Sequence, residues 1–198
     1  AVSSERRHQD HLERQRKILS RAGPVEVEWN GQTLVNFASN DYLGLAADDA
    51  LISAARSAAL QHGIGSGSSA LISGYSPEHE LLERELAEFL QRERVLLCVS
   101  GYHANLAVLT SLARREDVIV QDRLCHASLI DGARLSGAQL RRYAHLDVEG
   151  LARQLDRGCK GHSLVVTDGV FSMDGDSAPL QDLAAVCTAR DAWLVVDD

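Results

Sequence analysis

The chain has 198 residues, of which 45% are hydrophobic and 24% are charged, and its formal net charge is −8 at pH 7. This length allows one large domain or two small ones around a buried core, and the composition is that of a soluble globular protein. The acidic balance argues against broad nucleic-acid binding. No apolar run approaches the length of a membrane span, and the polar amino terminus predicts no signal peptide.

The four cysteines lie far apart and form no CxxC pair. They therefore argue against a zinc site and against a disulfide framework, and they favour a reducing cytoplasm as the compartment. His8 and His11 have a spacing that could bind a metal, but no acidic or thiolate partner follows them. A solvated helix face is the better interpretation, so we expect no metal. Lys17 and Lys160 are the only lysines.

The first 22 residues place Leu12, Ile18 and Leu19 on one side of a charged segment, which predicts an amphipathic helix. Alternating residues before and after Asn30-Gly31 predict a β-hairpin, because this dipeptide favours a two-residue turn. Short polar residues then predict a loop up to about residue 45. We therefore expect an amino-terminal segment, residues 1–45, followed by a larger segment, residues 46–198.

Asp48 or Asp49 is expected to cap an Ala-rich helix that runs to about His62. The glycine-rich stretch 63–69 predicts a flexible loop, because a helix precedes it and its glycine spacing excludes a dinucleotide-binding loop. Ser76 and Pro77 then begin a second helix. Its expected buried face consists of Leu81, Leu82, Leu86, Phe89 and Leu90.

From Val95 onward, short β-branched runs alternate with helical patterns. This alternation predicts an α/β fold with a mostly parallel sheet and helices on both faces. The expected strands are 95–100, 118–121, 139–143, 163–168 and 193–197, and the expected helices are about 102–113, 128–135, 148–157 and 180–190. Because the sequence stops on the last of these strands, we expect a domain that is incomplete at its carboxyl end.

Chemically distinctive groups follow four of the predicted strands. Gly101 and Tyr102 begin a helix whose free backbone N–H groups can bind phosphate. His126 offers an imidazole, Ser172 a hydroxyl and Asp197 a carboxylate. Ligands of open α/β sheets bind at the carboxyl ends of the strands, so these groups are expected to share one site. Each also has a structural alternative, in turn geometry, an ordinary hydrogen-bonded histidine or a helix cap.

Together these groups match what pyridoxal 5'-phosphate (PLP) requires of a protein. The cofactor needs an anchor for its phosphate, a partner over its ring, a donor to its phenolic oxygen and a carboxylate at its pyridine nitrogen. The carboxylate keeps that nitrogen protonated, so the ring can accept electrons from a substrate carbanion. PLP is therefore the expected cofactor.

Six motifs in this order resemble those of the α-oxoamine synthases, which are PLP-dependent acyltransferases of the aspartate aminotransferase fold (PLP fold type I). The motifs are Asn40–Leu45, Gly63–Gly67, Ser100–Tyr102, His126–Leu129, Val170–Asp176 and Val195–Asp198. The resemblance extends from about residue 36 to the end. It implies that residues 46–198 are the first part of a PLP-binding large domain.

The resemblance also implies a role for each candidate residue. The backbone of Gly101 and Tyr102 would hold the phosphate, and Ser172 would bond the phenolic oxygen. His126 would stack on the ring and contact substrate, and Asp197 would pair with the pyridine nitrogen, which makes these two the expected catalytic residues. The family also binds substrate through an arginine of its amino-terminal helix. By spacing this is Arg14, with Arg16 as the alternative.

Within the family, Gly65–Gly67 and Phe171–Asp176 are most similar to the members that condense L-alanine with a pimeloyl thioester in biotin synthesis. The acyl carrier, coenzyme A or a carrier protein, stays open. Three alternative functions also stay open: a glycine-using member of the family, a fold-type-I aminotransferase and a non-catalytic binding module. The resemblance further implies a homodimer with the active site between subunits.

The family continues beyond its paired aspartates with a histidine, the lysine that forms the Schiff base and a smaller carboxyl-terminal domain. Neither Lys17, in a charged segment, nor Lys160, in a Gly-rich loop, is a credible substitute for that lysine. We therefore expect the 198-residue chain by itself to bind PLP poorly and not to turn over.

Overall fold

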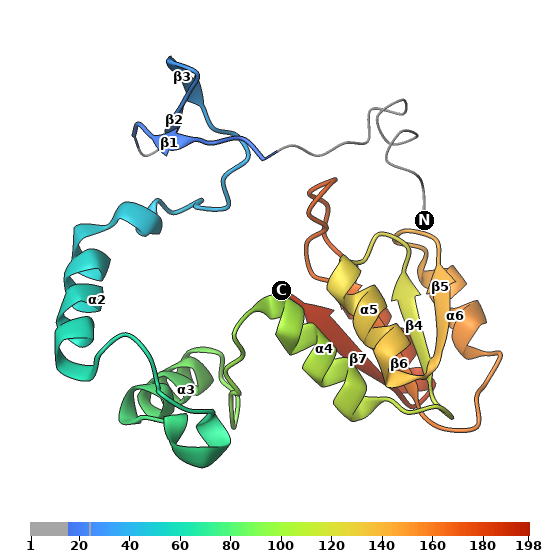
Figure 1. The fold of residues 1–198 in the computed structure, drawn as a ribbon. Helices are drawn as coiled ribbons and strands as arrows, with labels where there is room; N and C mark the ends of the chain where they lie inside the picture. Colours follow the sequence, from blue (N-terminus) through green and yellow to red (C-terminus); the bar gives the residue numbers. More distant parts are fainter. Residues whose placement is uncertain (1–15, 24) are drawn as a thin grey trace, which may run out of the picture. The chain divides into compact units, whose positions relative to one another are not determined.

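The structure is a computed structural model that describes residues 16–23 and 25–198 (Figure 1). The chain forms two compact units, Ala1–Ser76 and Pro77–Asp198, and each is described by itself below. The boundary near residue 45 that the sequence suggests stays a prediction. Within the described ranges, no helix is both long enough and apolar enough to cross a membrane.

The first unit contains a small antiparallel sheet of order β1-β2-β3. Its strands are β1 (Ser20–Arg21), β2 (Glu26–Trp29) and β3 (Gln32–Val35). Asn30 and Gly31 join β2 to β3 with φ angles of 50° and 75°. Positive φ at both central residues is what a two-residue turn between twisted strands requires, so the predicted hairpin is confirmed.

The predicted amphipathic helix is wrong where the structure describes it. Ser20 and Arg21 pair with Glu28 and Val27 on the edge of the hairpin, so their backbone groups are used in a sheet. The pairing outweighs a weak local helical preference, because every extended residue here gains a partner strand. Residues 1–15 of the predicted helix, with His8, His11 and Arg14, lie outside the described residues.

After β3, residues 36–44 form turns without helix or strand, and short helices and one glycine-rich loop follow. The helical elements are η1 (Leu45–Ala47), α2 (Asp49–His62) and the π-helical turn η2 (Ala70–Gly74). Asp48 caps α2, because its carboxylate accepts the N–H of Leu51 at 3.0 Å. The predicted helix and its cap are therefore confirmed. Residues 63–69 form a loop without helix or strand, as predicted.

In the second unit, α3 (Pro77–Phe89) lies where the sequence predicts a helix, but its expected burial is wrong. Leu81, Leu82 and Phe89 are exposed, and Ala87 is the buried residue of this helix. Helical periodicity identifies the apolar face of a helix. It does not show whether another element covers that face.

Four parallel strands form the sheet of the second unit in the order β5-β4-β6-β7. They are β4 (Val118–Asp122), β5 (Gln139–Tyr143), β6 (Ser163–Asp168) and β7 (Ala192–Asp197). All three pairings are parallel, so the four carboxyl ends share one edge. The predicted α/β class, its parallel sheet and these four strands are confirmed.

The predicted strand 95–100 is wrong in the described structure. This segment has no strand pairing, and Leu96 and Val99 are exposed. Its β-branched and apolar residues favour an extended backbone, but a strand also needs a neighbour to complete its hydrogen bonds. Here the N–H of Leu97 instead donates to the Glu83 carboxylate on α3 at 3.2 Å.

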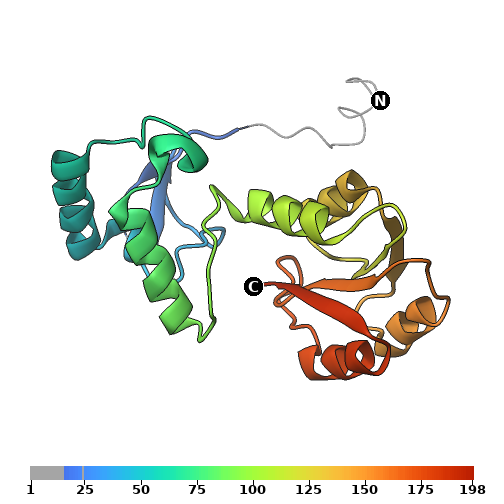
Figure 2. The ribbon, with the colours of Figure 1, turned by 90° about the horizontal axis from the view of Figure 1, so that it is seen from below.

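Helices cover both faces of this sheet, as predicted, and Figure 2 shows the layers. Helices α4 and α5 pack on one face, and α6 and α7 pack on the other. The elements are α4 (Gly101–Leu112), α5 (Ala127–Ser136), α6 (Val148–Leu155) and α7 (Leu180–Ala189).

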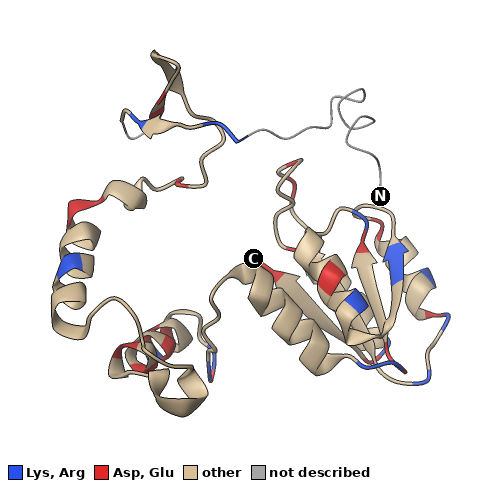
Figure 3. Ribbon diagram, in the orientation of Figure 1, with Lys and Arg blue, Asp and Glu red and all other residues tan. Residues whose placement is uncertain are grey.

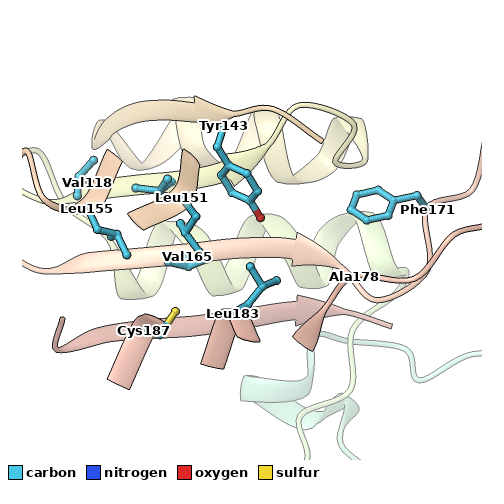
Figure 4. Packing of buried hydrophobic residues seen from close by; sticks show 10 residues of the cluster. Val118, Tyr143, Leu151, Leu155, Val165, Phe171, Ala178, Leu183 and Cys187 are labelled. Carbon is cyan, nitrogen blue, oxygen red and sulfur yellow. The ribbon is translucent and has the colours of Figure 1, made fainter. Parts of the chain in front are cut away.

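Alternation along β4 divides the core into two clusters. Val118 joins Leu151 of α6 and Leu183 of α7 on one face (Figure 4). Val120 belongs to the same cluster, whereas Ile119 joins the α4 and α5 residues on the other face. Successive side chains of a strand point to opposite faces, and both faces of β4 are covered, so its first three residues are all apolar. This packing fixes the loops at the carboxyl ends of the strands.

Candidate active site

A cavity of about 250 Å³ lies at the carboxyl edge of the sheet in the second unit. It is lined by Gly101, Tyr102, Asn105, His126, Asp168, Val170, Ser172, Asp197 and Asp198. The structure thus brings together all five site residues that the sequence predicts in this unit. The sixth, Arg14, lies outside the described residues.

The beginning of α4 presents two free backbone donors to this cavity. Ser100 caps the helix: its Oγ accepts the N–H of His103 at 3.3 Å, and its carbonyl accepts the N–H of Ala104 at 3.0 Å. The described contacts give the N–H groups of Gly101 and Tyr102 no partner. A Cβ at Gly101 would meet no atom within 4 Å, so the space beside this backbone is open. Free N–H groups at the positive end of a helix dipole form an anion site.

The side chain of Tyr102 makes a hydrogen bond outside the cavity lining. Its hydroxyl donates to Oδ2 of Asp131 on α5 at 2.8 Å, and this hydrogen bond raises the pKa of the Tyr102 phenol. The backbone of Tyr102 is therefore the part of this residue that remains available for an anion.

His126 immediately precedes α5 and is held at its backbone. Its N–H donates to both carboxylate oxygens of Asp168, at 3.1 and 3.2 Å, which ties it to the end of β6. Its Nδ1 lies 2.7 Å from the Ser128 hydroxyl and accepts the N–H of Ser128 at 3.3 Å. The imidazole is exposed, so its face is accessible from the cavity.

Carboxylates gather at the end of the sheet. Asp168 and Asp197 end β6 and β7 and are direct partners in the parallel register, and Asp198 also lines the cavity. Figure 3 shows acidic residues at the end of β7 and in the loop after β6. Burial and the nearby Asp197 raise the pKa of Asp168, against the lowering effect of its hydrogen bond from His126. This edge favours a cationic group of a ligand.

Ser172 lies in the loop between β6 and α7, and the loop is anchored beside it. Phe171 is buried, its N–H donates to the Asp176 carbonyl at 2.9 Å, and its carbonyl accepts the N–H of Gly175 at 2.8 Å. The Phe171 ring packs at 89° to the His145 imidazole, with 4.4 Å between the ring centroids. The exposed Ser172 hydroxyl is thereby placed at the cavity on a fixed turn.

Four lining residues are not among the predicted site residues: Asn105, Asp168, Val170 and Asp198. The Nδ2 atom of Asn105 lies 2.7 Å from Asp197 Oδ2, a contact between positions 92 residues apart. One available signal was spacing, since Asn105 lies one helical turn after Gly101. For Asp168, the signal was its place at the end of a buried strand.

Lys160, the lysine of the second unit, lies away from this cavity. Lys160 borders a separate hollow with Arg115 and Glu116, which precede β4 and so lie at the amino ends of the strands. The Nζ of Lys17 lies 4.7 Å from the centre of the Trp29 ring in the first unit. The cavity lining contains no lysine among the described residues.

Residues 32–198 match the family model described as aminotransferase class I and II. The chain belongs to this family.

Curated relatives show which members of the family this chain resembles in sequence. Two of those named 8-amino-7-oxononanoate synthase serve as examples. The one from Salmonella schwarzengrund is 50% identical over 193 residues, which are 98% of this chain and 50% of the relative. The one from Cellvibrio japonicus is 49% identical over 198 residues, which are 100% of this chain and 50% of the relative. The chain spans about half the length of the curated relatives it matches.

Solved structures place this aminotransferase-family chain among PLP enzymes of the same fold. Serine palmitoyltransferase from Sphingomonas wittichii superposes with a TM-score of 0.90 and 32% identity, over 98% of this chain and 50% of that one. The enzyme from S. paucimobilis, with a bound PLP–myriocin aldimine, gives a TM-score of 0.87 and 30% identity, over 91% and 46% of the two chains. The predicted aspartate aminotransferase-like fold and the resemblance to α-oxoamine synthases are confirmed.

Proposed function

We propose that this chain forms the PLP-binding part of a biotin-synthesis enzyme that condenses L-alanine with a pimeloyl thioester. The observation that carries the proposal is the shared cavity: Gly101, Tyr102, His126, Ser172 and Asp197 come from four separate segments and line one hollow. The 50% identity to 8-amino-7-oxononanoate synthase supports the choice of reaction.

The residues of the cavity have the chemistry that PLP needs. The unpartnered N–H groups of Gly101 and Tyr102 suit a phosphate, and the Asp197 carboxylate suits a protonated pyridine nitrogen. Donors and carboxylates belong to different segments of the lining, which matches a ligand that is anionic at one end and cationic at the other. When bound, PLP supplies an electron-accepting ring that stabilises negative charge on a substrate carbon.

Each residue then has a defined task. Asp197 holds the proton on the pyridine nitrogen, Ser172 donates to the phenolic oxygen, and His126 covers one face of the ring and contacts substrate. The buried sheet under these loops keeps the groups in place before substrate arrives, so little reorganisation is needed during the reaction. The Schiff-base lysine would come from outside these 198 residues.

The proposed partners follow from the same relatives. The substrates are L-alanine and a pimeloyl thioester of coenzyme A or a carrier protein, and the enzyme works as a homodimer. All four cysteines are free thiols in the described structure, which agrees with the cytoplasm as the proposed compartment.

The test uses protein expressed from the full reading frame, with Asp197→Asn compared against Asp191→Asn, an exposed aspartate immediately before β7. Wild type is expected to bind PLP and to release carbon dioxide from L-alanine only when a pimeloyl thioester is present. We expect Asp197→Asn to lower kcat by about 10² to 10³-fold, the range for losing one preorganised electrostatic contact. Asp191→Asn should behave as wild type.

Two results would overturn the proposal. An unchanged rate in Asp197→Asn would remove the assigned role of this carboxylate. Transfer of the amino group from alanine to keto acids, without any reaction of the thioester, would make the protein an aminotransferase instead.

A further inference from the structure

Asn105 occupies the centre of a hydrogen-bond chain that joins the two expected catalytic residues. It lies on the first turns of α4, and only 9% of its surface is exposed. Its Nδ2 lies 2.7 Å from Oδ2 of Asp197 and 2.9 Å from Oγ of Ser128. The Ser128 hydroxyl, which is fully buried, lies 2.7 Å from Nδ1 of His126.

Donor and acceptor capacities give this chain one direction. An ionised carboxylate only accepts hydrogen bonds, so the amide nitrogen of Asn105, not its oxygen, must face Asp197. The second amide hydrogen then binds Ser128 Oγ. Having accepted there, the Ser128 hydroxyl has one hydrogen to donate, and His126 Nδ1 is the acceptor within reach.

The direction of the chain determines where His126 carries its proton. Its Nδ1 accepts the backbone N–H of Ser128 at 3.3 Å, and that direction makes it also the acceptor of the Ser128 hydroxyl at 2.7 Å. In the neutral imidazole the ring proton therefore lies on Nε2, because the nitrogen that accepts cannot also be the donor. The described contacts record no protein partner for Nε2, so this N–H remains available to a ligand.

Close packing of α4 against α5 makes the chain possible. A Cβ at Gly132 of α5 would lie 3.2 Å from the Asn105 carbonyl and 3.0 Å from Cδ1 of Leu109. The glycine thus permits a helix approach that a larger residue would hinder, and the approach brings Asn105 within reach of Ser128.

We propose that Asn105 is a positioning residue: it orients the Asp197 carboxylate and, through Ser128, sets the ring tautomer of His126. On the Asp197 side it holds Oδ2 and leaves Oδ1 for a cationic group in the cavity. On the His126 side it presents Nε2–H to the substrate or cofactor. The roles toward PLP rest on the proposed function, whereas the tautomer of His126 does not.

The tautomer is tested by nitrogen NMR of histidine-labelled protein from the full reading frame, with His126→Gln identifying the His126 signals. Wild type is expected to show the Nε2–H form. Ser128→Ala removes the shorter of the two donors to Nδ1 and leaves only the backbone N–H at 3.3 Å, so the share of the Nδ1–H form should rise to a detectable level. Asn105→Asp should do the same, since the introduced carboxylate accepts the Ser128 hydroxyl and draws it away from His126. Wild-type signals in both variants would overturn the proposal.

The catalytic consequence is tested by steady-state kinetics and by the visible absorbance of bound PLP. Asn105→Asp is close to isosteric, and Thr110→Ala is the control on the same helix, because the Thr110 hydroxyl donates to the backbone carbonyls of Leu106 and Ala107. We expect Asn105→Asp to lower kcat by at least roughly tenfold to a hundredfold, because Asp197 loses a hydrogen bond to a charged group and gains a second carboxyl group beside it. The KM values should change little, and the pH at which the PLP absorbance titrates should move.

The outcomes separate this inference from the proposed function. A wild type that neither binds PLP nor consumes the thioester would remove the proposed function. The NMR result would still show whether the hydrogen-bond chain sets the tautomer of His126. An active wild type with Asn105→Asp indistinguishable from it in kcat and absorbance would remove the positioning role alone. If Asn105→Asp does not fold, Ser128→Ala tests whether the hydrogen-bond chain sets the His126 tautomer. Retention of the wild-type tautomer in Ser128→Ala would refute that part of the proposal.

Discussion

The imidazole of His145 lies between two carboxylates, with Nε2 2.8 Å from Oδ2 of Asp176 and Nδ1 3.0 Å from Oδ1 of Asp122. Asp122 ends β4, whereas Asp176 belongs to the loop that carries Ser172. Asp174 of that loop is also near, since its carboxylate, the Asp176 carboxylate and His145 offer polar atoms within 4.8 Å of one another. A protonated imidazole donates from both nitrogens, so His145 fastens this loop to the sheet.

This arrangement predicts a loss of stability toward alkaline pH. Burial lowers the pKa of His145, but the hydrogen bonds that its protonated ring donates to Asp176 and Asp122 raise it more, so the net pKa lies above its ordinary value of 6.5. A raised pKa in the folded state means that the contribution is fully present below about pH 6.5 and is lost as the pH rises through the folded pKa. His145→Gln should therefore cost about 1–3 kcal/mol in the acidic range and less above it.

Urea unfolding of His145→Gln at about pH 6 and about pH 9 measures this difference against wild type. His103→Gln, at an exposed histidine of α4 whose Nδ1 lies 2.9 Å from the Ser100 hydroxyl, is the control, and any loss it causes should be the same at both values. An equal loss for His145→Gln at both pH values would show that protonation of the imidazole does not hold the loop.

The contacts of Asp117 predict that the stability of the protein depends on pH with the opposite sign. Its carboxylate accepts the N–H of His162 at 2.7 Å and the N–H of Arg114 at 2.7 Å. The bond from His162 is the main cause of a lowered pKa, which burial partly opposes. A lowered pKa in the folded state stabilises the protein above the ordinary value of 3.8, and this contribution is lost as the pH falls through the folded pKa.

Asp117→Asn should therefore lower the free energy of unfolding by about 1–3 kcal/mol near neutral pH. The gap to wild type should narrow as the solution is acidified, because the wild-type carboxyl then also becomes neutral. Chemical denaturation at several pH values checks this, with Asp191→Asn as an exposed control. A gap that stays constant down to the acid transition would contradict the assignment.

Much of the fold follows from signals that are local in sequence. Asn30-Gly31 determines its turn through backbone conformation alone, and Asp48 caps α2 within three residues. The site could be anticipated for a similar reason. Once β4, β6 and β7 are parallel, their carboxyl ends must meet, so residues that follow them converge without knowledge of any individual contact.

What the sequence could not show depends on partners distant in the chain. Val95–Ser100 has the composition of a strand, but the described residues provide no strand to pair with it. Leu82 of α3 lies on an apolar face whose cover cannot be read from helical periodicity. Asn105 was missed because its partner is 92 positions away, and only the packing of α4 beside the sheet makes that contact.

The burial pattern of the second unit predicts unequal costs for the same leucine truncation. Leu151 of α6 is fully buried, whereas Leu135 of α5 is 65% exposed. Leu151→Ala should lower the free energy of unfolding by about 2–5 kcal/mol, because it leaves a cavity in the core. Leu135→Ala should change it by about 0.5 kcal/mol or less. Denaturation of both variants tests the packing, and equal losses would contradict it.

Arg14 stays a prediction, and a matched pair of variants tests it. Both proposed substrates carry a carboxylate, which a guanidinium binds through two parallel hydrogen bonds. Losing a hydrogen bond to a charged group costs about 1.5–3 kcal/mol, so Arg14→Ala should raise the KM of the substrate it contacts by roughly tenfold to a hundredfold. Arg16→Ala should have little effect. KM values measured separately for L-alanine and the pimeloyl thioester identify the bound carboxylate. An effect confined to Arg16→Ala would transfer the role to that residue, and no effect from either variant would remove the predicted substrate contact from this segment.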